Sequence, residues 1–279
     1  SDYKGREYRI HDYAFQNENA LTKIVIPDCV TIIGSFAFEK CTRLTEIIIP
    51  DSVIRIDNYA FSNCSALAHV SIGGGLTEIG NYVFMYCSSL TEIVIPDNIT
   101  HLWHGAFSGS AIKTVYIGSG LTNVVGNVFE NMNCLTNIEV SVDNQCFKSI
   151  DGVLYTKDGS TLVHYPTAKT GSEYVILDGV TTILEYAFSK YTLLTHLVLP
   201  DSLTSVSEDL LYYCKNLELN EYESGLYLGS LTNPYLVLVK AKSQDITSLT
   251  IHQNTRIVMD NALVGCISLV DVTFNDNIT

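Results

Sequence analysis

The cysteines are the residues whose spacing most directly suggests chemistry. Five of the eight cysteines share one position of a repeating pattern, and they are Cys41, Cys64, Cys87, Cys214 and Cys266. Such a column would suit disulfides or a metal site. However, side chains in register on stacked parallel coils point the same way rather than toward one another, and no C-x₂-C spacing of the metal-binding kind occurs. We therefore expect buried, reduced thiols that serve packing.

Two other patterns resemble functional motifs and have simpler explanations. His101 and His104 flank Trp103 without a third metal ligand nearby, which favours an exposed loop pair. Gly73 to Gly75 is too short for a phosphate-binding loop and falls where a turn is expected. No nucleophile, base and orienting group occur at a recognisable spacing. These observations predict a protein that is not an enzyme and needs no cofactor or metal.

The composition excludes several classes of partner. The net charge is -14 and the sequence pI is near 4.7, which argues against nucleic acids and anionic membranes, because both are bound through Lys and Arg. The hydrophobic fraction of 47% supports a continuous core. No run reaches the roughly 20 apolar residues that span a bilayer, and the start does not resemble a signal peptide. Both ends fall in mid-repeat, so we expect a piece of a longer protein.

The chain repeats itself about every 23 residues. Repeat starts fall at Leu21, Leu44, Leu67, Leu90, Ile112 and Leu135, and later at Gly171, Leu194, Leu217, Ile246 and Leu269. Counting from each start, positions +3 and +5 are apolar, and position +17 is Phe in six repeats. Agreement of this kind over most of the chain predicts a solenoid of stacked coils.

The order of residues within a repeat predicts the path of one coil. Side chains at +3 and +5 share one face of a strand because side chains alternate. Pro at +6 followed by Asp, as in Pro50-Asp51, predicts the end of the strand and a turn. Apolar residues at +9 and +12, such as Val53 and Ile56, predict a second buried segment. The Ala-Phe segment that follows is interpreted as a short helical turn.

The run from Leu44 to Cys64 (LTEIIIPDSVIRIDNYAFSNC) resembles the BspA-like, or treponemal-type, leucine-rich repeat. Similar units cover about residues 10–279. The resemblance implies a β-rich α/β solenoid, a right-handed coil with a parallel concave sheet and short helical turns, forming one domain over 1–279. It also implies a bacterial or protozoan surface or extracellular protein active in adhesion. Position +8 holds Cys29, Ser52, Gly75, Asn98 and Gly120, which speaks against an unbroken asparagine ladder.

Residues 141–170 and 218–245 interrupt the repeat. Alternating segments around Asp158-Gly159 and around Asn233-Pro234 predict two β-hairpin insertions. Such insertions either carry a binding site or are structural variants of the coil. We expect the register to resume at Tyr174 and at Leu249.

Two surfaces are candidates for binding. The outward positions +2 and +4 of the first strand combine polar with apolar side chains, although strands facing water seldom keep Val or Ile outside. The alternative is that β-propensity alone explains these residues. The predicted site is Lys23, Glu46, Ile48, His69, Ser71, Glu92, Val94, Thr114 and Tyr116. Position +15 carries an aromatic column that either binds sugars or a partner or shields the core: Tyr13, Phe36, Tyr59, Tyr82 and Tyr186.

The sequence thus favours a non-enzymatic binding module that recognises an unidentified protein or glycan through the repeat surface. The alternative is a structural spacer that presents another domain.

Overall fold

The computed structural model describes residues 8–188, 193–207, 210–211 and 214–278. Over these residues the chain is a β-solenoid that contains no helix. It divides into two compact units. Unit 1 is Ser1–Lys157 with Pro166–Lys169, and unit 2 is Asp158–Tyr165 with Thr170–Thr279.

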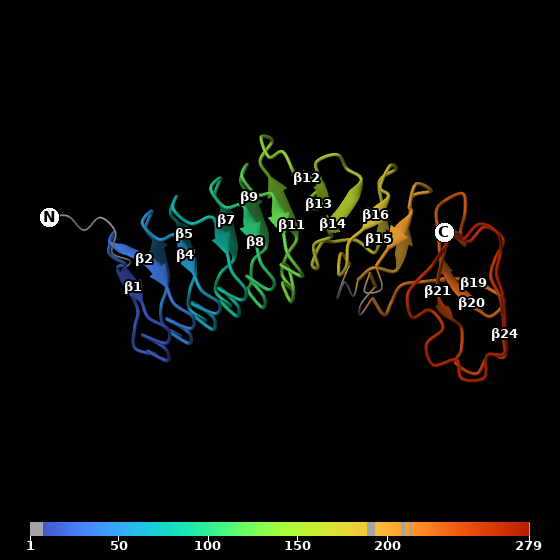
Figure 1. The fold of residues 1–279 in the computed structure, drawn as a ribbon, viewed down its shortest axis with the longest axis horizontal. Coiled ribbons are helices and arrows are strands. Elements are labelled where there is room, and N and C mark those ends of the chain that lie inside the picture. The colour runs from blue at the N-terminus through green and yellow to red at the C-terminus, as the bar shows by residue number, and fades with distance from the viewer. Residues whose placement is uncertain (1–7, 189–192, 208–209, 212–213, 279) are drawn as a thin grey trace. The chain divides into compact units, whose positions relative to one another are not determined.

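The first side of the unit 1 coils carries parallel strands in two ladders, which are together called the first sheet here (Figure 1). Its strands begin two positions after each repeat start because the apolar +3 and +5 residues must face inward. In the coil that starts at Leu44, Ile47 and Ile49 are buried while Ile48 between them is exposed. The strands are β3 (Glu46–Ile49), β5 (His69–Ile72), β7 (Glu92–Ile95), β9 (Thr114–Ile117) and β11 (Asn137–Val140).

The second side of each unit 1 coil carries a strand of two to four residues that contains position +12, within the predicted second buried segment. Val53 and Ile56 are buried there, and the parallel strands of this side, which form two separate ladders, are together called the second sheet here. Its strands are β1 (Tyr8–Ile10), β2 (Val30–Ile33), β4 (Arg55–Ile56), β6 (Glu78–Ile79), β8 (His101–Leu102) and β10 (Asn123–Val124).

The third side consists of turns, so the predicted helical turns and α/β character are wrong. In the coil that starts at Leu44, Tyr59 at +15 and Asn63 at +19 have left-handed backbones (φ 61° and 58°), which a right-handed helix excludes. The amide groups bond to the next coil instead of within a helix. The N–H of Tyr59 donates to Asn81 O (3.2 Å) and the N–H of Asn63 donates to Met85 O (2.7 Å). The turns therefore continue the ladder between coils.

The coil of residues 67–89 pairs differently from its neighbours. Its first strand, β5, pairs back to β3, whereas its second strand, β6, pairs forward to β8. In the described residues no ladder joins β5 to β7 or β4 to β6. Gly73 to Gly75 connects β5 to β6 within this coil, and a Cβ on Gly75 would lie 2.0 Å from Asp51 O. Glycine there allows the turn to lie directly on the turn of the preceding coil.

A single tryptophan lies at the next junction. Trp103 follows β8, and its indole N–H donates to Glu78 Oε2 on β6 of the preceding coil (2.9 Å). The two coils are thus joined by a side-chain bond as well as by the β6–β8 ladder.

In the interruption at 141–170, unit 1 contains an antiparallel pair, β12 (Phe147–Ile150) and β13 (Val153–Thr156). The turn between them is Asp151-Gly152, where both residues have positive φ. The turn expected at Asp158-Gly159 lies between β13 and β14 (Thr161–His164), at the point in the chain where the two units divide.

Unit 2 returns to parallel pairing. Tyr174 lies in β15 (Glu173–Val175), which pairs with β17 (His196–Val198), and Leu249 lies in β22 (Ser248–Thr250), which pairs with β24 (Asp271–Thr273). The register therefore resumes at both predicted residues. The other parallel strands on the coil path are β16 (Thr182–Ile183), β18 (Ser205–Val206) and β23 (Ile257–Val258).

The interruption at 218–245 contains an antiparallel set, β19 (Asn220–Tyr222), β20 (Gly225–Leu228) and β21 (Val237–Ala241). Asn233-Pro234 lies in the connection between β20 and β21. This connection is tied to a neighbouring turn, because Ser230 Oγ and Thr232 Oγ1 both donate to the Asp201 carboxylate at 2.5 Å.

Candidate functional site

Apolar side chains at position +4 of the first sheet face away from the core. Ile48 is 65% exposed, Val94 60% and Tyr116 37%. Their strand neighbours at +3 and +5 are buried, as alternation requires. These side chains gain nothing from the core, and exposed apolar groups that lie together typically mark an interaction surface.

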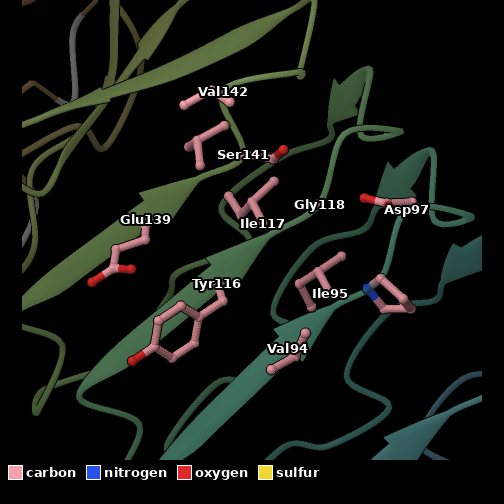
Figure 2. Close-up of a pocket in the computed structure, with 11 residues that line it drawn as sticks. Val94, Ile95, Asp97, Tyr116, Ile117, Gly118, Glu139, Ser141 and Val142 are labelled. Atoms are coloured by element: carbon pink, nitrogen blue, oxygen red, sulfur yellow. The ribbon is translucent and has the colours of Figure 1, made fainter.

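Pairing between strands brings three +4 residues into one row. Val94 on β7 is the register partner of Tyr116 on β9, and Tyr116 is the partner of Glu139 on β11. Figure 2 shows these three side chains on the same face of neighbouring strands. The row combines two apolar groups with one carboxylate.

The turns that end these strands complete a shallow groove of about 500 Å³. Its other lining includes the β7–β8 turn at Pro96-Asp97, Gly118 after β9, and Ser141-Val142 after β11. Val142 is 87% exposed. Gly118 keeps the turns close, since a Cβ there would lie 2.6 Å from Asp97 Oδ1.

Two carboxylates border the apolar surface. Asp97 Oδ1 accepts the Ser119 backbone N–H at 2.6 Å, and this bond lowers the pKa of Asp97 below its usual value. Glu139 accepts a bond from the Asn137 side-chain amide at 2.9 Å. Within the part of the chain that the structure describes, no ion pair includes Asp97, Glu139 or the exposed Glu92 of β7.

The other predicted site residues do not line the groove. Ile48 and Ser71 are register partners on β3 and β5, which no ladder joins to β7. Lys23 lies in a segment without strand structure, but its Nζ pairs with Glu46 Oε1 at 2.9 Å, and the pair lowers the pKa of Glu46. The outward +2 positions of β5, β7 and β9 carry His69, Glu92 and Thr114.

Of the residues that line the groove, only Val94 and Tyr116 belong to the predicted site, and three of the others contribute exposed side chains to it. Glu139 is the +4 residue of the coil that starts at Leu135, so extending the column by one repeat would have found it. Asp97 was interpreted only as a turn residue. Val142 lies where the repeat stops, and no periodic signal identifies it.

The aromatic column at +15 is stacked on itself. Tyr13, Phe36, Tyr59 and Tyr82 have centroids 4.9 to 5.2 Å apart and interplanar angles of 3 to 13°. The column ends at His104, which meets Tyr82 edge-on. Each inner ring presents its faces to neighbouring rings, so those faces are not open to a sugar. The arrangement favours a structural role that stabilises coil stacking.

The thiols at +20 act as hydrogen-bond donors inside the solenoid. Cys64 Sγ donates to Phe38 O at 3.1 Å and Cys87 Sγ donates to Phe61 O at 3.3 Å. Burial raises the pKa of Cys64 to about 12, so the thiol stays protonated. None of the eight cysteines, all of which lie in the described residues, forms a disulfide, and Cys41, Cys64 and Cys87 are buried as predicted. Cys214 and Cys266 of the same column are partly exposed.

The histidine pair does not converge on one point. His104 Nδ1 accepts the Asn127 N–H at 3.1 Å, and His104 Nε2 lies 3.2 Å from Glu130. His101 instead contacts Thr100 Oγ1 through Nδ1. No cluster of three or more potential metal ligands occurs among the residues described.

A second hollow, of about 220 Å³, lies beside Trp103. Its polar groups are already bonded to one another: Glu78 accepts from the indole, and Arg55 Nε pairs with Asp57 Oδ1 at 3.0 Å. The groove on the first sheet is the stronger candidate, because it has exposed apolar groups and carboxylates that form no ion pair among the described residues.

The stacked coils, with inward apolar residues at +3 and +5 and a ladder on every side, define a leucine-rich-repeat β-solenoid. A comparison with known families matches the BspA type leucine rich repeat region in six copies, over residues 8–136, 168–229 and 241–279. The chain belongs to this family.

Solved structures of bacterial leucine-rich-repeat proteins share the fold. A leucine-rich repeat protein from Eubacterium ventriosum is 22% identical with a TM-score of 0.67, covering 93% of this chain and 74% of its own. A leucine rich cell surface protein from Faecalibacterium prausnitzii is 25% identical with a TM-score of 0.62, covering 95% and 82%. The pneumococcal vaccine antigen PcpA is 20% identical with a TM-score of 0.61, covering 100% and 74%. A comparison with curated proteins finds no significant match.

The described residues include no helix with the length and apolar character that crossing a bilayer requires.

Proposed function

We propose that the chain is a non-enzymatic binding module of a surface-displayed protein, and that unit 1 recognises a partner protein through its first sheet. The observation that carries the proposal is the row of exposed +4 side chains, with Val94 and Tyr116 side by side above the groove. These side chains point away from the core, so core packing does not require them to be apolar. Interfaces of this kind draw most of their energy from a few central aromatic or apolar anchors.

Surface display and a role in adhesion are supported by family membership and by a similar fold in a protein described as a leucine rich cell surface protein. Ile48 and Ser71 extend the contact surface toward the earlier coils. Lys23, Glu46, His69, Glu92 and Thr114 form its polar flank, which tunes specificity more than affinity.

The test is a binding screen against host extracellular proteins and glycans, followed by two substitutions. Tyr116→Ala with Val94→Ser should weaken binding by about 1–3 kcal/mol together and leave stability nearly unchanged. Tyr86→Ala with Ile54→Ser is the matched control, because these residues are similarly exposed (46% and 55%) but lie outside the first sheet.

An affinity that is insensitive to the Tyr116 and Val94 changes, but is lost in the control variant, would place the interface elsewhere on the solenoid. A screen that finds no partner for the folded protein would favour the spacer role instead.

A further inference from the structure

We propose that the groove binds a cationic segment of the partner protein, one that inserts an apolar side chain and places lysine or arginine beside it. This inference rests on the proposed function and adds the chemistry of the bound segment.

The centre of the groove suits one apolar side chain. Val94 and Tyr116 provide exposed apolar surface from neighbouring strands, and Val142 adds to it from the turn after β11. A volume of about 500 Å³ in an open groove is enough for a single side chain with its flanking backbone. Burying these groups on binding provides the favourable free energy.

The edges of the groove are acidic. In Figure 2, Asp97 and Glu139 lie on opposite sides of Tyr116 and Ile117. The Ser119 N–H bond fixes one carboxylate oxygen of Asp97, and both carboxylates keep acceptor capacity for a further donor. A segment that crosses the groove therefore meets a carboxylate on either side of its apolar contact.

The carboxylates around the groove are not neutralised by a cation among the described residues, which leaves them available to a cationic partner. Glu46 on β3 has its own cation, Lys23, whereas the acidic residues around the groove form no ion pair among the residues described. Glu92 adds a third such carboxylate on β7, two residues from Val94 and on the same face. With a net charge of -14 the protein attracts cations generally. An acidic segment would be repelled here, and a neutral one would leave the carboxylates unused.

The experiment uses the full chain and a displayed library of random twelve-residue peptides. Selection on the wild type is followed by removal of peptides that also bind the Val94→Ser/Tyr116→Ala variant. We expect the remaining peptides to combine an apolar residue with flanking Lys or Arg. In fluorescence anisotropy, Asp97→Asn and Glu139→Gln should each weaken the best peptide about three-fold, the usual size for an exposed ion pair.

Matched controls separate charge from structure. Asp51→Asn removes an equivalent carboxylate, which accepts the Gly74 N–H at 2.6 Å in the same turn position but two coils earlier. Glu173→Gln neutralises an outward carboxylate in unit 2. Neither should change peptide affinity. Raising the salt concentration should weaken binding to the wild type more than binding to the Asp97→Asn/Glu139→Gln variant.

Failure to enrich any peptide, or enrichment of peptides without excess positive charge, overturns the inference. Equal effects of Asp97→Asn and Asp51→Asn overturn it as well. A partner protein that still depends on Val94 and Tyr116 would in those cases leave the proposed function standing. A partner indifferent to both residues would contradict the proposed function itself.

Discussion

Replacing Asn144 by alanine should destabilise unit 1 strongly, because one buried side chain satisfies four backbone groups. Its Nδ2 donates to Gly118 O (2.9 Å) and Leu121 O (3.1 Å), and its Oδ1 accepts the N–H groups of Cys146 (2.9 Å) and Phe147 (2.8 Å). The side chain is fully buried. At about 1 kcal/mol net for each bond, the loss is about 4 kcal/mol.

Asn98 provides a natural comparison. It occupies the corresponding position two coils earlier and is only partly buried. Its side chain makes two such bonds, to Gly73 O and Leu76 O. The expected cost of Asn98→Ala is therefore about 2 kcal/mol. The measurement is equilibrium urea unfolding followed by far-ultraviolet circular dichroism.

An Asn144→Asp variant should make the stability of unit 1 depend on pH. Asn144→Asp keeps the acceptor but turns a carboxylate oxygen toward two carbonyls, and burial should raise the pKa of the new group above its unfolded value. This variant should be least destabilised at low pH, where the carboxyl is protonated, and should lose stability as pH rises through the folded pKa. An Asn144→Ala cost no greater than that of Asn98→Ala would refute the argument.

Three further outcomes are expected. Cys29 and Cys134 are exposed, so mass mapping after brief thiol labelling of the native protein should find them modified while the three fully buried thiols react only on unfolding. Tyr59→Ala loses two stacking partners and Tyr13→Ala one, so urea unfolding should show the former costing about 1 kcal/mol more. Burial lowers the pKa of His164 to about 3. Since the unfolded histidine binds a proton below about pH 6.5, stability should fall by about 2 kcal/mol from pH 7 to pH 5, and His164→Leu should remove that dependence.

The coil path was predictable because periodicity reports burial directly. Inward +3 and +5 residues such as Ile47 and Ile49 must repeat with the coil, and the end of each strand is marked by Pro and Asp. The helical turn was predicted wrongly because the Ala-Phe segment has a composition that suits a helix as well as a turn. The left-handed backbone at Tyr59 and Asn63 excludes a right-handed helix. Neither Tyr nor Asn requires this conformation, so the sequence alone does not reveal it.

The groove was predictable only in part. Val94 and Tyr116 follow from alternation along a strand, a purely local rule. Val142 and Asp97 join them because three consecutive turns end at one edge of the sheet, which depends on the structure of a segment outside the repeat. The missing ladder bonds on either side of the coil of residues 67–89 are likewise a feature of the structure that repeat spacing alone does not report.

The bond between Trp103 and Glu78 gives the molecule an optical reporter of its own. The chain has one tryptophan, and it lies in unit 1, bonded across the junction between two coils. Indole emission therefore follows the integrity of that junction and is blind to unit 2, whereas backbone dichroism averages over both units. The difference between the unfolding midpoints given by indole emission and by backbone dichroism measures how far the folding of one unit depends on the other. The same dependence decides whether binding at the first sheet changes the stability of unit 2.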